Sequence, residues 1–175
     1  MTVNEESVEA RIRLDDTDFE LLKLLQEDGR ATQAHLGKTV GLSGPSVFAR
    51  IKRMEKAGVI SGYTAVVHGS FVGQGLTAFI RVVTVAAASE KDEFEDFVHS
   101  SPMVHECHDV DGEDSYLLKV KVSGPAQLRV LLADIRSIEH VARTVSTIAL
   151  ETVKEHGAGA FLAFARVPTA GSDAE

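Results

Sequence analysis

Four cationic side chains lie close together in the stretch from Ser43 to Gly58, which reads Ser-Gly-Pro-Ser-Val-Phe-Ala-Arg-Ile-Lys-Arg-Met-Glu-Lys-Ala-Gly. The stretch opens with small polar residues and a proline and closes at a glycine, which is typical of an α-helix. Arginine can donate paired hydrogen bonds to a guanine edge or to a phosphate. Because small residues also let a helix approach a surface closely, such a helix can lie in the major groove of DNA.

The helical period separates this stretch into two faces. The apolar face carries Val47, Phe48, Ile51 and Met54. The opposite face carries Ser46, Ala49, Arg50 and Arg53, with Lys52 and Lys56 on its flank. We predict that DNA is contacted by Ser43, Ser46, Val47, Arg50, Lys52 and Arg53. The alternative for this helix alone is an amphipathic surface helix whose charges are only solvated.

A second group that could do chemistry is the run His-Glu-Cys-His-Asp from His105 to Asp109. On a strand, alternation would place His105, Cys107 and Asp109 on one face and the other two side chains on the opposite face. Alternate positions of one strand rarely converge on one metal ion, so sheet packing or ligand contact is the favoured interpretation. The chain shows no nucleophile paired with a base, phosphate-binding glycine motif or zinc spacing. The sequence therefore predicts no catalytic group, no metal and no cofactor.

The acidic loop that begins at Asp111 offers groups that can bind a small zwitterion. Gly112 permits a close backbone approach, and exposed N–H groups there can bind a carboxylate. Glu113 or Asp114 can face an α-ammonium group. The alternative for this loop is a plain acidic hairpin turn.

The cationic helix must be positioned by the segments before it. Asp15 and the acids that follow it are typical of a helix start, and the apolar stripe behind them ends at Gly29. A second, shorter helix is expected from Thr32 to Gly41, and a tight turn to Gly44 leads into the cationic helix. Helix, short helix, turn and cationic helix is the order of a helix-turn-helix domain. A three-helix bundle that does not bind DNA is the alternative.

The remainder of the chain alternates strand-like and helical patterns. An extended strand is expected at 59–67 and a hinge at 68–75, followed by strands at 76–87, 104–110, 115–122 and 142–153 and by helices that start at Ser89 and Pro125. The order βαββαβ predicts a ferredoxin-like half-sandwich with helices on one face of the sheet. The other face carries alternating apolar residues, so we expect another copy of the same sheet to cover it.

These patterns predict an α+β protein with four segments. They are a helix-turn-helix DNA-binding domain with an N-terminal arm at 1–62, a strand and hinge linker at 63–75, a ferredoxin-like domain for effector binding and oligomerisation at 76–155, and a tail at 156–175. The tail contains an apolar island, Phe161-Leu162-Ala163-Phe164, to which the sequence assigns no role.

The net charge of −8 at first argues against a nucleic-acid partner, but the charges are unevenly distributed. Between Arg30 and Lys56 there are six basic residues and one acid, whereas from Tyr63 onward there are nine basic and sixteen acidic residues. One segment is therefore locally basic. The chain has a single cysteine, Cys107, and its start shows no signal-peptide pattern. It also has no apolar run long enough to cross a bilayer. We therefore predict a cytoplasmic protein without a membrane partner.

Several short motifs follow one another in a specific order along residues 14–154. In the first half they are Leu14-Asp15, Asp18, Leu25-Gln26-Glu27-Asp28-Gly29-Arg30, Val40-Gly41-Leu42-Ser43, Val47, Arg50-Ile51, Arg53-Met54-Glu55, Gly58-Val59-Ile60 and Gly62-Tyr63. In the second half they are Pro102, Val104, Glu106-Cys107, Gly112-Glu113, Leu117-Leu118-Lys119-Val120 and Thr147. By these motifs the chain resembles the leucine-responsive regulatory protein (Lrp/AsnC) family.

The resemblance implies a winged helix-turn-helix domain and a ferredoxin-like domain that binds amino acids. It also implies dimers that pair through their sheets, assemble further into octamers and regulate transcription in response to a small effector. The effector site expected on this basis comprises His108, Val110, Gly112, Glu113, Asp114, Ser115, Tyr116 and Thr147. The alternative function is an architectural, nucleoid-associated protein that wraps DNA with little effector response.

Two positions depart from the family pattern. Gly37 replaces the usual alanine, which costs the second helix about 1 kcal/mol of intrinsic stability. In the effector loop, Gly112-Glu113-Asp114-Ser115 replaces Gly-x-x-Asp, so the aspartate is displaced by one position. A displacement by one position on a strand moves a side chain to the other face, and the identity of the effector therefore depends on this loop.

Overall fold

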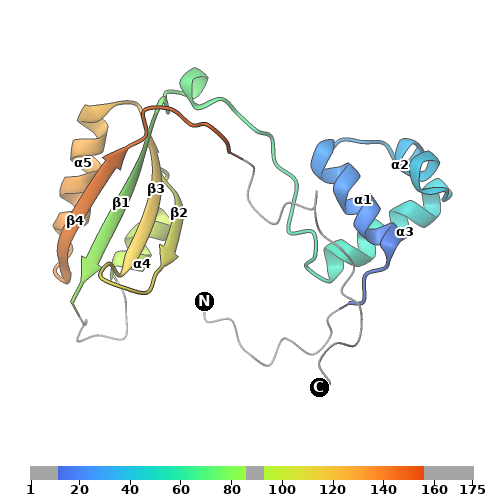
Figure 1. Cartoon of the computed structure of the whole chain (residues 1–175), viewed down its shortest axis with the longest axis horizontal. Coiled ribbons are helices and arrows are strands. Elements are labelled where there is room, and N and C mark those ends of the chain that lie inside the picture. The colour runs from blue at the N-terminus through green and yellow to red at the C-terminus, as the bar shows by residue number, and fades with distance from the viewer. Residues whose placement is uncertain (1–11, 86–92, 156–175) are drawn as a thin grey trace. The chain divides into compact units, whose positions relative to one another are not determined.

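The computed structural model describes residues 12–85 and 93–155, and the chain divides into two compact units between Ala65 and Val66 (Figure 1). The first unit is helical, and the second contains a four-stranded sheet. Each unit has its own cluster of buried apolar side chains. Within the described ranges, no helix is long and apolar enough to cross a membrane.

The described residues of the first unit form three helices, and each helix begins after a side chain that accepts a backbone hydrogen bond. They are α1 (Asp16–Glu27) after Asp15, α2 (Gln33–Val40) after Thr32 and α3 (Gly44–Lys56) after Ser43. These caps satisfy N–H groups that have no partner within the helix. The three helix starts expected from the sequence are confirmed. The N-terminal arm expected at 1–13 lies almost entirely outside the described residues.

The core of the first unit is built from one face of each helix. It buries Leu21, Leu22, Leu36, Val47, Ile51 and Met54. Phe48 departs from the predicted apolar face, because its side chain is 45% exposed. The Lys52 ammonium of the same helix lies 5.8 Å from the centre of this partly exposed ring.

The turn between α2 and α3 explains the glycine at position 37. A methyl group there would lie 2.5 Å from the carbonyl oxygen of Leu42, which is too close for any side chain unless the backbone moves. Gly41, which ends α2, has a φ angle of 71° that favours glycine. The intrinsic weakness of α2 therefore accompanies a close approach between α2 and the start of α3.

A fully buried carboxylate, Asp18, joins α1 to α3. The backbone N–H of Asp18 donates to the Asp15 carboxylate (2.9 Å) and that of Asp15 donates to Asp18 (3.1 Å), which completes a capping box. From α3, Arg50 Nη1 donates to Asp18 Oδ1 (2.8 Å) and Arg53 Nη2 donates to Asp18 Oδ2. A buried charge is tolerated only when it is paired in this way.

The expected strand at 59–67 is wrong. Residues 61–68 contain no strand, and a short 3-10 helix, Gly69–Val72, follows them. A strand needs a neighbour to pair with, and the first unit provides none among its described residues. The Tyr63 hydroxyl donates instead to the Glu55 carboxylate (3.2 Å), which attaches the start of this segment to α3.

The second unit confirms the order βαββαβ. Its elements are β1 (Leu76–Thr84), α4 (Glu93–Ser100), β2 (Val104–Asp109), β3 (Tyr116–Val122), α5 (Pro125–Arg136) and β4 (Val141–Ile148). The sheet is antiparallel with the strand order β2-β3-β1-β4. The expected cap of the first helix, Ser89, lies outside the described residues, and the last strand ends at Ile148, five residues before its expected end at Val153.

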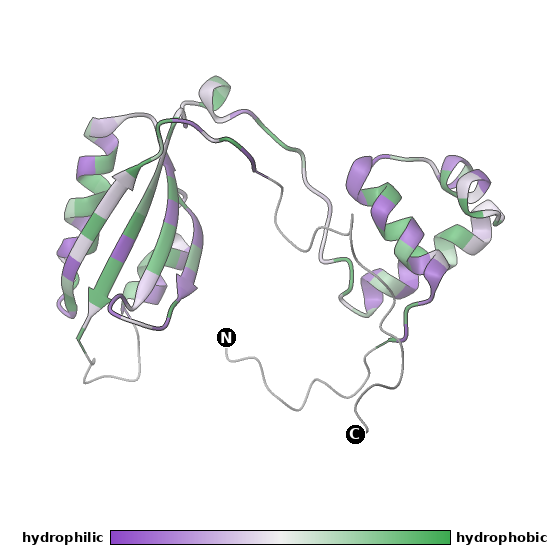
Figure 2. Ribbon diagram, viewed as in Figure 1, coloured by the Kyte–Doolittle hydropathy of each residue, from purple (hydrophilic) through white to green (hydrophobic). Residues whose placement is uncertain are grey.

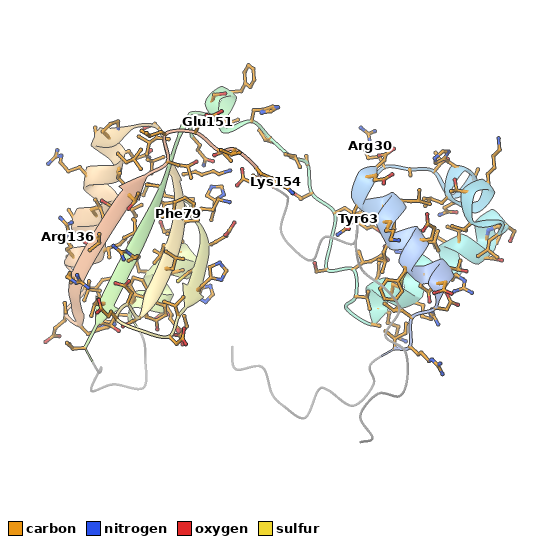
Figure 3. The ribbon with its side chains drawn as sticks, in the orientation of Figure 1. Arg30, Tyr63, Phe79, Arg136, Glu151 and Lys154 are labelled. Atoms are coloured by element: carbon orange, nitrogen blue, oxygen red, sulfur yellow. The ribbon has the colours of Figure 1, made fainter. Side chains whose placement is uncertain are left out.

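Alternation along the strands gives the sheet two different faces, as the hydropathy colours indicate (Figure 2). One face packs against α4 and α5 (Figure 1) and buries Ala78, Ile80, Val82, Leu118, Val120 and Val122. The register aligns the other side chains in two rows, His108–Leu117–Arg81–Val145 and Glu106–Lys119–Phe79–Thr147. We call this second surface the open face; Phe79 near its middle is 40% exposed (Figure 3).

The buried position of Asp18 gives a first prediction. Asp18→Asn removes the charge that holds both arginines, so we expect the first unit to lose about 2–4 kcal/mol of its free energy of unfolding. Hydrogen exchange of the α1 and α3 amides in the whole chain measures this loss. Asp16→Asn is the matched control, because Asp16 is exposed in the same helical turn. A loss of similar size in both variants would show that the pairing does not matter.

Candidate functional site

The outward surface of α3 is formed by small and cationic side chains. The exposed residues of this helix are Pro45, Ser46, Phe48, Ala49, Lys52, Arg53 and Lys56. The Ser43 and Ser46 hydroxyls lie 2.8 Å apart, and Ser43 also caps the helix. Ser46 and Ala49 leave room for a close approach, and the cations lie beside them.

The structure places two predicted DNA contacts elsewhere. Val47 is fully buried in the core, so its assignment as a DNA contact is wrong. Arg50 was expected on the exposed face, but its side chain is 30% exposed and its Nη1 donates to Asp15 (2.7 Å) and Asp18 (2.8 Å). These bonds lower the pKa of Asp15 and raise that of Arg50. Arg50 therefore holds α3 on α1.

Arg53 and Lys52 are paired within the unit but remain exposed. Arg53 binds Asp18 through one nitrogen while 46% of its side chain is open to solvent. Lys52 Nζ lies 2.6 Å from Glu55, and this lysine lowers the pKa of the Glu55 carboxyl. Lys56 is exposed, and no ion pair joins it to another described residue. The predicted set omitted Lys56, although its place on the flank of the cationic face was evident from the helical period.

The loop between β2 and β3 is held at its base by hydrogen bonds. The Val110 N–H donates to the Ser115 carbonyl (3.0 Å), and the Ser115 N–H donates to the Val82 carbonyl (2.8 Å). The Ser115 hydroxyl accepts a third bond from the Thr84 N–H (3.0 Å). Gly112 lies exposed at the tip with a φ angle of 117°, which side chains rarely adopt. The base of the loop is thus fixed to the end of β1.

Asp114 is engaged by two arginines that the predicted site did not include. Its carboxylate lies 3.6 Å from Arg81 Nη1 on β1 and 3.7 Å from Arg143 Nη2 on β4. An effector ammonium at Asp114 would have to compete with both guanidinium groups. Glu113 is exposed beside it. Arg81 could have been found from the sequence, because a single charge in an apolar strand at alternate spacing belongs to the face opposite the core.

The remaining predicted effector residues are divided between the two sides of the sheet. Tyr116 packs on the helix side, with its ring centre 4.7 Å from that of Phe94 and its hydroxyl donating to Glu95 (3.3 Å). Tyr116 therefore does not lie on the open face, and its role in the effector site stays a prediction. His108 is 60% exposed on the open face. Thr147 also lies on the open face, where it pairs with Phe79. The loop is attached to β1 near Val83, and Phe79 lies four residues away along this strand, so Thr147 is about 13 Å from the loop attachment.

A charge network occupies the other row of the open face. Lys119 Nζ binds Glu106 (2.9 Å) and Glu155, and Lys121 Nζ lies 3.3 Å from Glu155. Hydrogen bonds to the carboxylates raise the pKa of Lys119, and those from the lysines lower the pKa values of Glu106 and Glu155. These pairs hold the segment after β4 against the open face.

The run from His105 to Asp109 is not assembled into a metal site. Cys107 packs against the core of the second unit, while His108 faces Glu106 on the open face (3.6 Å). Within residues 12–85 and 93–155, no three His, Cys, Asp or Glu side chains are placed to hold a metal ion. The geometry thus offers two candidate surfaces, the outer face of α3 and the loop beside the open face.

Comparison with known proteins matches each of the two units to a family model. Residues 14–61 match the winged helix-turn-helix DNA-binding family model, and residues 77–159 match the Lrp/AsnC ligand binding domain. The chain is 40% identical over 139 residues to the HTH-type transcriptional regulator LrpA of Mycobacterium tuberculosis, covering 79% of this chain and 91% of that protein. It is 33% identical over 144 residues to the leucine-responsive regulatory protein of Escherichia coli, covering 81% and 88%.

Solved structures agree. A transcriptional regulator from Neisseria meningitidis in complex with L-Met has a TM-score of 0.78 at 33% identity, covering 82% of this chain and 94% of that one. The crystal structure of M. tuberculosis LrpA has a TM-score of 0.71 at 37% identity, covering 81% and 96%. The two matched regions correspond to the two units of the structure, and the solved relatives share this architecture. These findings confirm the resemblance and the expected α+β fold. The chain belongs to the Lrp/AsnC family of transcriptional regulators.

Proposed function

We propose that this protein is a cytoplasmic, non-enzymatic regulator that binds double-stranded DNA through α3 and responds to an amino acid bound near Gly112. The observation that carries the proposal is the outer face of α3, on which Ser46 and Ala49 are exposed between cationic side chains. An overall charge of −8 makes non-specific attraction to DNA weak, so binding must rely on this local surface.

In the proposed complex, α3 lies in the major groove. Ser46 and Arg53 contact base edges or phosphates, and Lys52 and Lys56 contact phosphates. Arg53 can turn part of its guanidinium to DNA while Asp18 holds the rest, because nearly half of its side chain is exposed. Arg50 contributes by fixing the angle of the helix on α1.

The open face supports self-association. Phe79 is 40% exposed there, and Leu117 and Val145 flank Arg81 in the neighbouring row. We expect a second copy to cover this face, which yields a symmetric dimer and places two α3 helices against a palindromic site. Dimers assemble further into an octamer. An amino acid that binds one assembly state more tightly than another then changes DNA affinity.

The effector site is expected at the loop around Gly112, between two copies of the chain. A relative of known structure was solved as an L-Met complex, which supports an α-amino acid as the ligand class. The loop tip would bind the carboxylate through backbone N–H groups, and exposed Glu113 would face the ammonium. Val110 and Ser115 hold the loop in place, and His108 and Thr147 remain candidates on the open face.

A charge placed on the outer face of α3 tests the DNA site. Ala49→Glu puts a carboxylate where a phosphate or base edge must approach, so we expect operator affinity to fall at least about 30-fold. Fluorescence anisotropy with labelled operator at fixed salt measures the change. Ala126→Glu in α5 is the matched control, because it makes the same charge change at an exposed position of the other unit.

Two outcomes would contradict this assignment. Equal DNA affinity of the Ala49 and Ala126 variants would remove α3 from the groove. Footprints of the parent protein that are long and nearly independent of sequence would favour an architectural role over site-specific regulation.

Substitution of Gly112 tests the effector site. Gly112→Tyr adds a bulky ring at the loop tip, so we expect it to bind DNA normally but lose any change in operator affinity with the amino acid. Gly112→Ala is the control for backbone strain, because any side chain is disfavoured at a φ of 117° while no atom lies within 4 Å of the added methyl group. The alanine variant should keep most of the response. A normal response from Gly112→Tyr would exclude this loop.

A further inference from the structure

Two arginines flank the loop on the open face, and they outnumber the carboxylate between them. Arg81 on β1 pairs in register with Val145, and Arg143 on β4 pairs with Val83, so the two arginines are diagonal neighbours on one face. Asp114 contacts each of them through a different oxygen. Like charges on neighbouring strands repel, and one carboxylate offsets only one of the two.

The contacts with Asp114 leave hydrogen-bonding capacity on both arginines. Distances of 3.6 Å and 3.7 Å are those of charge contacts, beyond the usual length of an N–H···O hydrogen bond. The Arg81 and Arg143 side chains are 53% and 56% exposed, whereas the Asp114 side chain is only 17% exposed. A ligand therefore has access to guanidinium N–H groups that Asp114 does not occupy.

Other charged groups near the loop define how a ligand would lie. Asp111 and Glu113 are exposed in the loop, and no ion pair joins either of them to a described arginine. His108 lies two strands from Arg81 in the same row, facing Glu106. The surface thus has an acidic loop tip beside a cationic pair, which matches a ligand that carries an ammonium at one end and a carboxylate at the other end of a short side chain.

We propose that the effector of this protein is an acidic amino acid, whose side-chain carboxylate is bound by Arg81 and Arg143. This inference rests on the effector site proposed above and specifies the ligand that the site takes. Guanidinium and carboxylate form charge-assisted, often paired hydrogen bonds. An amide of the same shape offers a neutral acceptor and a donor that faces the guanidinium N–H groups. Discrimination between glutamate and glutamine is therefore the property that these two arginines predict.

Calorimetric titration of the full-length protein at constant ionic strength tests the proposal. The probes are glutamate, aspartate, glutamine, asparagine, leucine and methionine. We expect glutamate or aspartate to bind at least about ten-fold more tightly than its own amide, and more tightly than leucine or methionine. Equal binding of each acid and its amide would overturn the proposal.

Variants connect the preference to the arginines. Arg81→Gln and Arg143→Gln should each weaken binding of the acid about ten-fold while leaving binding of the amide nearly unchanged. Asp114→Asn removes the competing carboxylate and should strengthen binding of the acid. Arg129→Gln is the matched control, because this exposed arginine lies on α5, which covers the opposite face. A loss of acid binding in the Arg129 variant as large as in the others would also overturn the proposal.

The outcomes separate this inference from the proposed function. If leucine or methionine binds best and Gly112→Tyr abolishes that binding, the effector site stands and the acidic ligand is wrong. If none of the six amino acids binds while the protein still binds DNA, the effector function and the inference fail together.

Discussion

The buried carboxylate of Asp18 is the interaction on which the DNA-binding unit depends. Its charge lies in a region without solvent and is tolerated only because a backbone N–H and two guanidinium groups surround it. The same carboxylate therefore completes the capping box at the start of α1 and joins α3 to that helix. The charges of Arg50 and Arg53 suggest DNA contacts, but both side chains donate hydrogen bonds to Asp18 and stabilise the fold. The surface that we propose for DNA contact is consequently narrower than the cationic pattern indicates and centres on the exposed residues Ser46 and Ala49.

The second unit depends on a different constraint, because both of its helices lie on the same face of the four-stranded sheet. Alternation along β1 places Phe79 and Arg81 on the uncovered side, where their neighbours are mixed apolar and charged. The Ser115 N–H donates to β1 and the Ser115 hydroxyl accepts from it, and these two hydrogen bonds attach the β2–β3 loop to the end of β1. A rigid loop base beside an uncovered face brings together groups from three separate segments. For this reason the chemistry of the proposed effector site does not depend on the loop alone.

The sequence predicted features that depend on neighbours along the chain and missed those that depend on distant partners. The three caps of the first unit, the glycine that ends α2 and the βαββαβ order are local or periodic features, and these are found. The engagement of Arg50 could not be predicted, because its partners Asp15 and Asp18 lie 35 and 32 residues away. Val47 was assigned both to the apolar face of its helix and to the DNA contacts, and its complete burial is compatible only with the core. Tyr116 was assigned by proximity to the loop, although strand alternation directs it to Phe94.

Burial distinguishes the two aspartates that each hold a pair of arginines. Asp18 is fully buried, and Arg50 binds it within normal hydrogen-bond distance, so removal of this contact would leave an uncompensated charge. Asp114 retains solvent contact and lies 3.6–3.7 Å from its arginines, so water or another carboxylate can replace it at small cost. The contact of Asp18 with its arginines is therefore structural, whereas a ligand can replace Asp114 at the second pair of arginines, which we call the exchangeable pair. Since the exchangeable pair lies on the face expected to meet a second copy, a change in its charge alters the free energy of sheet pairing. In the assembly that we propose, this change in pairing is how a small ligand bound to the second unit would alter DNA binding by α3.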